Sequence, residues 1–133
     1  MELAELLKVS DYVSIHSPLT PETKGMFNAD AFAQMKQGSY VVNTARGPII
    51  DEAALAAAID SGHLAGAALD VMTNEPPVNS PLIGKRNVII TPHTSFYSEE
   101  SLVELQTKAA QEVANVLMDK APRNPVNVLQ ATK

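Results

Sequence analysis

The amino-acid sequence predicts an α/β fold, with a parallel sheet of about four strands and a long C-terminal helix. Three observations support this prediction. Four short apolar runs recur about every 25 residues. Segments with helix caps lie between these runs, and the runs lack the polar alternation of a half-exposed sheet. Because parallel neighbours need a crossover, usually a helix, this alternation of elements is typical of βαβ units.

The four expected strands are short and continuously apolar. Two of them consist only of β-branched or aromatic residues, which favours strand over helix. Continuous apolar runs of this length also indicate strands that are buried on both faces of a sheet. The four runs are residues 12–15, 40–42, 67–69 and 88–90.

Helical segments are expected between the runs. Residues 2–7 resemble the end of a helix that precedes the first strand. Asn28 is a candidate N-cap for a short helix over 29–36, because its side chain can accept a hydrogen bond from the first turn. Asp51 is a candidate N-cap for a second helix, over 52–59, which is rich in alanine.

The longest helix is expected in the last third of the chain. Ser98 can cap its N-terminus, and the helix should end near Asp119, before Pro122. Apolar side chains recur along it at helical spacing and give it one apolar stripe. The tail over 122–127 should be extended. The stripe consists of Leu102, Leu105, Ala109, Val113, Val116 and Leu117.

The composition excludes several classes of function. With 10 Lys and Arg against 15 Asp and Glu, the formal charge is −5, so the chain lacks the basic footprint of a protein that binds nucleic acid or an anionic membrane. The absence of cysteine excludes disulfides, thiolate metal sites and a cysteine nucleophile. No His, Asp and Glu stand at metal-ligand spacing, and no apolar run is long enough to span a membrane. Met1 is followed by acidic residues rather than by a signal-like segment, so we expect a cytoplasmic protein.

Polar and ionisable residues follow each of the four expected strands. In open α/β sheets, ligands bind beyond the carboxyl ends of the strands. Four such segments at one edge of a sheet therefore indicate a binding site there. The segments are residues 16–21, 43–47, 70–77 and 91–95.

Six motifs in a fixed order resemble the C-terminal part of the D-isomer-specific 2-hydroxyacid dehydrogenase family, over about residues 3–127. The family includes phosphoglycerate dehydrogenase, glyoxylate-hydroxypyruvate reductase and corepressor-related branches. The resemblance implies that residues 1–97 form the second, C-terminal half of a Rossmann-type NAD-binding domain, and that 98–133 form a returning helix and an extended tail of the same compact unit. The motifs are HSPLTPETKG (16–25), VNTARG (42–47), DEAAL (51–55), GAALDV (66–71), NEPP (74–77) and NVIITPH (87–93).

The resemblance implies an oxidoreductase that transfers a hydride between a nicotinamide cofactor and a small D-2-hydroxy acid or 2-oxo acid. It assigns Arg46 to the substrate carboxylate and carbonyl, His93 to acid/base chemistry, and Glu75 to the role of a buried partner of His93. A guanidinium is a planar fork that fits two neighbouring oxygens, and an imidazole can both donate and accept a proton near neutrality. From the residues alone, a structural role is the commoner interpretation: Arg46 in a surface turn, His93 in a packed Pro-His turn and Glu75 in an ordinary loop.

The expected cofactor is NAD, with NADP left open. Asp70 would contact the nicotinamide carboxamide, although from the residues alone it could be a turn cap. The sequence contains no Gly-x-Gly-x-x-Gly turn for the cofactor phosphates, so we expect little activity from this chain alone. The full set of expected cofactor-binding residues is Ser17, Pro18, Thr44, Ala45, Arg46, Asp70 and His93.

An alternative function is a non-catalytic, dinucleotide-responsive scaffold or corepressor-like binding module, because corepressor relatives keep the Arg, Glu and His set. Phe96 and Tyr97 resemble the corepressor-related and reductase branches and suggest an apolar wall for a substrate pocket. Half of a doubly wound sheet would also expose the strand over 12–15 and part of one face. We therefore expect a homo-oligomer, most simply a two-fold dimer.

Overall fold

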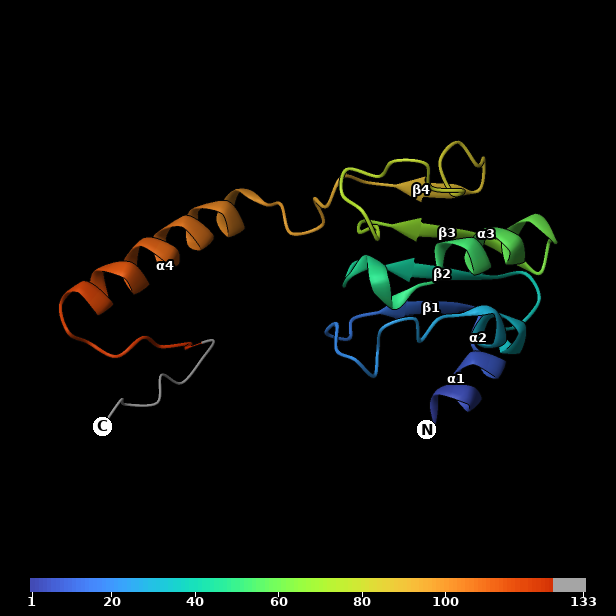
Figure 1. The fold of residues 1–133 in the computed structure, drawn as a ribbon, viewed down its shortest axis with the longest axis horizontal. Coiled ribbons are helices and arrows are strands. Elements are labelled where there is room, and N and C mark those ends of the chain that lie inside the picture. The colour runs from blue at the N-terminus through green and yellow to red at the C-terminus, as the bar shows by residue number, and fades with distance from the viewer. Residues whose placement is uncertain (126–133) are drawn as a thin grey trace. The chain divides into compact units, whose positions relative to one another are not determined.

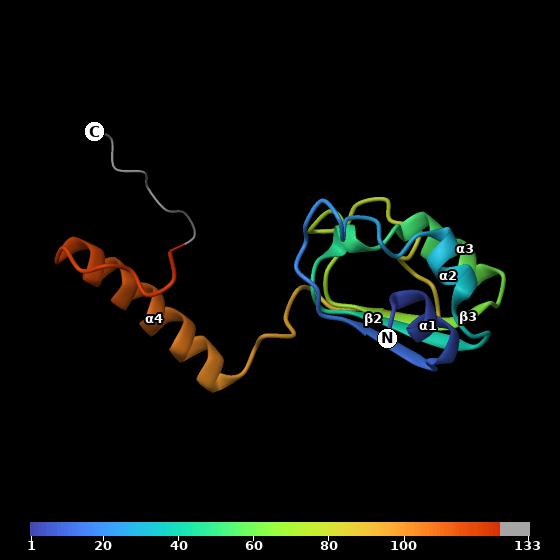
Figure 2. The ribbon, with the colours of Figure 1, turned by 90° about the horizontal axis from the view of Figure 1, so that it is seen from below.

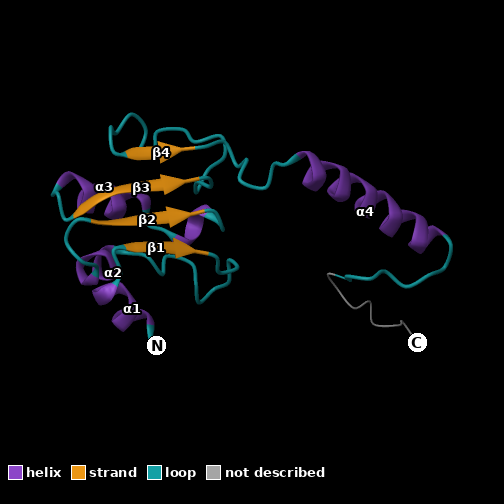
Figure 3. Cartoon of the chain, turned by 180° about the vertical axis from the view of Figure 1, so that it is seen from behind, coloured by secondary structure: helices purple, strands orange, loops and turns teal. Residues whose placement is uncertain are grey.

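The computed structural model describes residues 1–125 of the chain. The chain forms two compact units, one over residues 1–95 and a second that begins at Phe96. The first unit contains a sheet of four parallel strands in the order β1-β2-β3-β4, and all four point the same way in Figure 3. The predicted α/β class and the parallel sheet are therefore confirmed. The strands are β1 (Tyr12–Ile15), β2 (Ser39–Asn43), β3 (Leu64–Leu69) and β4 (Val88–Ile90).

Neighbouring strands pair in a register that aligns their carboxyl ends. One row across the sheet consists of Val13, Val41, Ala67 and Val88, each paired with the next. Because the sheet is parallel, the segments that follow the strands all leave from the same edge. β1 lies at one border of the sheet, as the sequence predicted.

Helices of the first unit cover one face of the sheet. Figure 2 shows α2 (Ala29–Gln34) and α3 (Glu52–Asp60) side by side above the strands. α1 (Leu3–Val9) packs against α2 near β1 (Figure 1). The core lies between these helices and the sheet. Its largest fully buried side chains are Phe32, Leu7, Ile49, Leu55, Leu64 and Leu82.

Both helix caps expected in this unit are present. Asn28 Oδ1 accepts a hydrogen bond from the Ala31 amide over 3.1 Å, and Asp51 Oδ1 accepts from the Ala53 and Ala54 amides, each over 3.0 Å. Each cap satisfies backbone N–H groups that a helix leaves without an internal partner. α2 ends at Gln34, two residues before the predicted end.

The prediction that the strands are buried on both faces is wrong for this unit. Tyr12 is 70% exposed, and its ring stacks on that of Tyr40 with centroids 5.1 Å apart. Ile89 on β4 is 66% exposed. The reason is that α2 and α3 lie on one side of the sheet, so only alternate side chains reach the core.

β3 begins at Leu64, three residues before the predicted start at residue 67. Alanine and glycine are poor strand formers, so residue propensity did not predict that Ala65 and Gly66 belong to the strand. The structure explains the glycine, because a Cβ there would lie 2.4 Å from the Asn87 carbonyl oxygen. Glycine therefore fits at position 66 because the backbone of Asn87 lies so close, and not because glycine favours a strand.

The second unit contains α4 (Glu99–Leu117). Ser98 forms the expected N-cap, in a capping box with Ser101. The helix ends at Leu117, close to the predicted end, and none of its residues is buried. Phe96 and Tyr97 precede it as an edge-to-face pair with centroids 4.4 Å apart. The predicted extended tail, over 122–127, and the predicted segment over 98–133 both run into residues 126–133, which lie outside the described residues.

Within residues 1–125, no helix combines the length and apolar character needed to cross a bilayer.

Candidate active site at the carboxyl edge of the sheet

Asn43 shapes the turn that follows β2. Its side chain is fully buried, donating from Nδ2 to the Arg46 carbonyl over 3.0 Å and accepting at Oδ1 from the Ala45 amide over 3.0 Å. Its carbonyl accepts from the Asp70 amide over 2.9 Å, which joins the turn to the end of β3. Sequence reasoning assigned Asn43 no role. A polar residue directly at the end of an apolar strand was the signal that could have revealed it.

Arg46 lies on this turn with an exposed side chain. Its Nη1 donates to the Ala45 carbonyl over 2.6 Å. This contact uses one of the five N–H donors of the guanidinium. The turn therefore positions the guanidinium itself through Nη1, while its other N–H donors can pair with an anion.

Gly47 allows the Arg46 turn to contact the segment that carries Glu75. A Cβ at Gly47 would lie 2.0 Å from the Met72 carbonyl carbon and 2.5 Å from the Thr73 amide nitrogen. Real Cβ atoms do not approach backbone so closely, so only glycine fits without a displacement. The turn after β2 and the segment after β3 are thus packed backbone against backbone.

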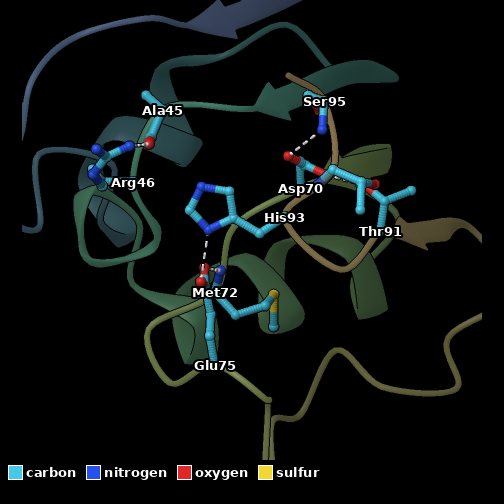
Figure 4. A network of polar contacts seen from close by, with 9 residues as sticks. Ala45, Arg46, Asp70, Met72, Glu75, Thr91, His93 and Ser95 are labelled. Atoms are coloured by element: carbon cyan, nitrogen blue, oxygen red, sulfur yellow. Dashed lines mark hydrogen bonds and ion pairs between the residues drawn. The ribbon is translucent and has the colours of Figure 1, made fainter. Parts of the chain in front are cut away.

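Asp70, at the end of β3, anchors the segment that follows β4. It is only 4% exposed. Oδ1 accepts from the Thr91 hydroxyl and from the Thr94 amide over 2.8 Å, and Oδ2 accepts from the Ser95 amide over 2.9 Å. Figure 4 shows Asp70 between Thr91 and Ser95. The carboxylate holds the 91–95 segment on both sides of His93.

These hydrogen bonds also set the ionisation of Asp70. Burial raises the pKa of the carboxyl, because a charge loses its hydration. The bonds from Thr91, Ser95 and Thr94 outweigh burial and hold the pKa well below its ordinary value. Asp70 is therefore an anion at neutral pH, and both of its oxygens accept hydrogen bonds from the 91–95 segment.

His93 and Glu75 meet at this edge, as the sequence predicted. His93 Nδ1 lies 2.8 Å from Glu75 Oε2, and the second Glu75 oxygen accepts from the Met72 amide over 2.9 Å (Figure 4). These hydrogen bonds, that from His93 first, lower the pKa of the Glu75 carboxyl. An ionised carboxylate can only accept, so Nδ1 carries the proton and donates it.

The expectation that Glu75 is buried is wrong. Its side chain is 38% exposed and that of His93 is 42% exposed. Glu75 lies on a segment that passes over the sheet edge rather than into the core, and Pro76 and Pro77 follow it. Water therefore reaches both side chains.

The other predicted cofactor residues also follow β1 and β2 at this edge. Ser17, Thr44 and Ala45 are half-buried, whereas Pro18 is exposed and accepts at its carbonyl from the Thr23 hydroxyl over 2.7 Å. Figure 4 shows Ala45 and Arg46 on the side of His93 opposite Glu75. The second ring nitrogen of His93 points toward that side in the same view.

A cavity of about 330 Å³ lies on the Glu75 side of the histidine. Its lining is mostly apolar, with the ionisable side chains at its wall, which is typical of small-molecule sites. Across residues 1–125, no three His, Asp or Glu side chains converge as metal ligands would. The cavity is lined by Asp70, Met72, Glu75, Pro76, Pro77, Ile90, Thr91, Pro92 and His93.

Comparison with known proteins is consistent with this architecture. The sequence profile described as "D-isomer specific 2-hydroxyacid dehydrogenase, NAD binding domain" matches residues 1–95. The chain is 40% identical over 129 residues to D-3-phosphoglycerate dehydrogenase of Bacillus subtilis, covering 97% of this chain and 25% of that protein. The chain thus spans about a quarter of the length of this curated relative.

Solved structures show the same fold. A D-lactate dehydrogenase from Treponema pallidum superposes with a TM-score of 0.90 at 34% identity, over 96% of this chain and 43% of that chain. A D-isomer specific 2-hydroxyacid dehydrogenase from Lactobacillus delbrueckii, in its NAD-complexed form, gives a TM-score of 0.85 at 32% identity, again over 96% and 43%. The four-stranded half-sheet therefore has counterparts within longer proteins.

Proposed function

Because the chain belongs to the D-isomer specific 2-hydroxyacid dehydrogenase family, we propose that it supplies the proton-handling and substrate-binding side of an NAD-dependent oxidoreductase. The reaction is a 2-oxo acid plus NADH and a proton giving a D-2-hydroxy acid plus NAD. The observation that carries the proposal is the 2.8 Å contact between His93 Nδ1 and Glu75 Oε2, at the same sheet edge as Arg46.

His93 is the proposed acid/base. Its Nδ1–H donates to Glu75, which leaves Nε2 as the atom that exchanges a proton with the substrate oxygen. In the reductive direction, the imidazolium donates from Nε2 to the carbonyl oxygen and becomes neutral. The ionised Glu75 favours the imidazolium before this transfer and keeps the ring oriented after it. The 42% exposure of the His93 side chain supports reprotonation from water.

Arg46 is the proposed carboxylate receptor. Its remaining N–H donors can pair with two carboxylate oxygens at once, which orients the 2-oxo acid as well as binding it. Since the Ala45 carbonyl accepts from Nη1, the guanidinium is positioned before substrate arrives. Such positioning lowers the entropic cost of productive binding.

The residues present fit the nicotinamide half of the cofactor. Ser17, Pro18, Thr44 and Ala45 form the proposed surface for it, and Asp70, at the end of β3, is the proposed contact of the carboxamide. When bound, NADH supplies the hydride that reduces the carbonyl carbon. NADP remains an open alternative to NAD. The 133 residues contain no glycine-rich phosphate turn, so we propose weak cofactor binding and little turnover by this chain alone.

NADH consumption at high chain concentration, with a panel of 2-oxo acids, tests the proposal. We expect slow turnover to a D-2-hydroxy acid. It should be abolished in His93→Asn and should need much higher substrate concentration in Arg46→Gln. His63→Asn is the matched control, because His63 bonds to the Phe32 carbonyl on the helical side of the sheet. NADH binding without turnover on any substrate would favour the scaffold function instead.

We also propose self-association, most simply a two-fold dimer, on the evidence of the edge position of β1 and the exposed Tyr12, Tyr40 and Ile89. The expected cytoplasmic location remains a prediction from sequence.

A further inference from the structure

The side chain of Glu52 bridges two points of one loop. Glu52 is the first residue of α3 and is half-buried. Its Oε1 accepts from the Thr73 amide over 2.7 Å, and its Oε2 accepts from the Ser80 hydroxyl over 2.5 Å. These partners lie 21 and 28 residues further along the chain. One carboxylate therefore closes the 73–80 segment at both ends.

This segment carries Glu75 and has little else to hold it. Two consecutive prolines, Pro76 and Pro77, provide no amide hydrogens. Within residues 1–125, no backbone–backbone hydrogen bond joins 73–79 to the rest of the chain. Apart from the packing of the Thr73 backbone beside Gly47, its fixed points are therefore side-chain contacts, and Glu52 provides those at the two ends.

Glu75 has a demanding geometry within this segment. One of its oxygens accepts from the Met72 amide and the other from His93 Nδ1, so both are committed. Met72 directly precedes Thr73, which Glu52 holds. A shift of the Thr73 backbone would therefore move the Met72 amide and turn the Glu75 carboxylate away from the imidazole.

We propose that Glu52 is a positioning residue for the Glu75–His93 pair, acting through the two ends of the 73–80 segment. This inference rests on the proposed function only for its catalytic consequence. The DEAAL motif then has a divided role: Asp51 caps α3, whereas Glu52 reaches out of the helix to the neighbouring loop.

Amide hydrogen exchange and ring N–H NMR signals of the 133-residue chain test the proposal. In Glu52→Ala, we expect the Met72 amide to exchange roughly tenfold faster, as expected for a lost hydrogen bond to a charged acceptor. The His93 Nδ1–H signal should broaden or vanish. Glu52 contacts neither group, so a role confined to α3 would leave both readouts unchanged.

Glu52→Gln is the conservative variant, since its carbonyl oxygen can still accept from the Thr73 amide. It should restore most of the Met72 protection and the His93 signal. Asp51→Ala is the matched control, because it removes the α3 cap without touching the loop. It should speed exchange in α3 while leaving Met72 and His93 unaffected.

If Glu52→Ala does not fold, Ser80→Ala removes one of the two anchors of the segment. It should give a smaller loss of Met72 protection and of the His93 signal.

Unchanged Met72 exchange and an unchanged His93 signal in Glu52→Ala, or in Ser80→Ala if the Glu52→Ala variant is unfolded, would overturn the inference. These readouts need no turnover. Absence of NADH consumption in the unaltered chain would therefore contradict the proposed function alone. Where turnover is measurable, Glu52→Ala should lower kcat roughly tenfold with little change in the KM for NADH, the pattern of an impaired proton-transfer group.

Discussion

The backbone amide of His93 donates to the Asp70 carbonyl over 2.9 Å, so the histidine is fastened to the end of β3 although it follows β4. The Asp70 carboxylate strengthens this attachment by accepting from the Thr94 and Ser95 amides. One residue thus fixes the segment through its backbone and its side chain. This arrangement makes Asp70 a determinant of stability as well as of site geometry.

Replacing Asp70 with asparagine should lower the free energy of unfolding by about 2 kcal/mol, because the amide nitrogen cannot accept the bonds that the buried carboxylate oxygen accepts. Urea denaturation followed by circular dichroism measures this change. Asp60→Asn is the control: the Asp60 side chain is 65% exposed, so its ion pair with Lys85 should be worth less than about 1 kcal/mol. Equal effects of the two variants would contradict the anchoring role.

Stability should fall in acid because Asp70 and Glu75 have lowered pKa values in the folded chain. Between the ordinary carboxyl pKa, near 4, and the lower folded pKa, the unfolded chain binds more protons than the folded chain. The contribution is therefore complete above about pH 5 and is lost as the pH falls below about 4. Thermal unfolding at a series of pH values tests this, and Asp70→Asn should show a shallower acid dependence.

Gly47→Ala should destabilise the chain by roughly 2 kcal/mol or more, because the new Cβ meets the Met72 backbone, which cannot swing aside as a side chain would. Gly25→Ala is the comparison variant, because it introduces backbone strain without a steric clash. Gly25 has a φ of 65° but open space around it, so that variant should cost only about 1 kcal/mol. Denaturant midpoints of the two variants give the comparison, and a milder effect at Gly47 would refute the close-packing argument.

The isolated chain should bind NADH with a dissociation constant of about 1 mM or weaker, since it lacks the turn that would receive the pyrophosphate. Nicotinamide mononucleotide should bind within about threefold of NADH, because the adenylate half would gain few contacts. Titration calorimetry with both ligands measures the difference. Micromolar affinity for NADH would show that the phosphates are held by another part of the assembly.

Light scattering across a dilution series should reveal self-association of the chain. Tyr12→Lys and Ile89→Lys place charges on the exposed sheet face and should shift the equilibrium toward monomer. Val9→Lys changes an equally exposed apolar residue on α1 and serves as the control. A monomer at every concentration would exclude both the face and the β1 edge as interfaces.

Local chemistry made much of this fold predictable. The caps at Asn28, Asp51 and Ser98 form because a short polar side chain preceding a helical segment has nearby amides to satisfy. The strand ends were predictable as the candidate site because parallel strands place their carboxyl ends at one edge of the sheet. The meeting of His93 and Glu75 followed from that geometry and from the family resemblance.

Contacts between distant segments were not predictable in the same way. Glu52 looks like an ordinary first-turn acid of a helix, and only the folded chain shows that Thr73 and Ser80 lie within its reach. The tight approach of Gly47 to Met72 is likewise a tertiary contact. The exposure of Glu75 depends on the path of its loop, which residue types alone do not specify.

The φ of 55° at His93 limits which mutations can isolate the chemistry of its imidazole. Asparagine tolerates this left-handed backbone better than other side-chain-bearing residues, whereas alanine or glutamine would add a conformational penalty of about 1 kcal/mol. Substitution of His93 by alanine would therefore mix a loss of the proposed proton transfer with a displaced loop, and would overstate the share of the proposed acid/base role. The same penalty restricts which residues can occupy position 93. Where selection for the imidazole is relaxed, substitutions to asparagine or glycine should therefore be tolerated best.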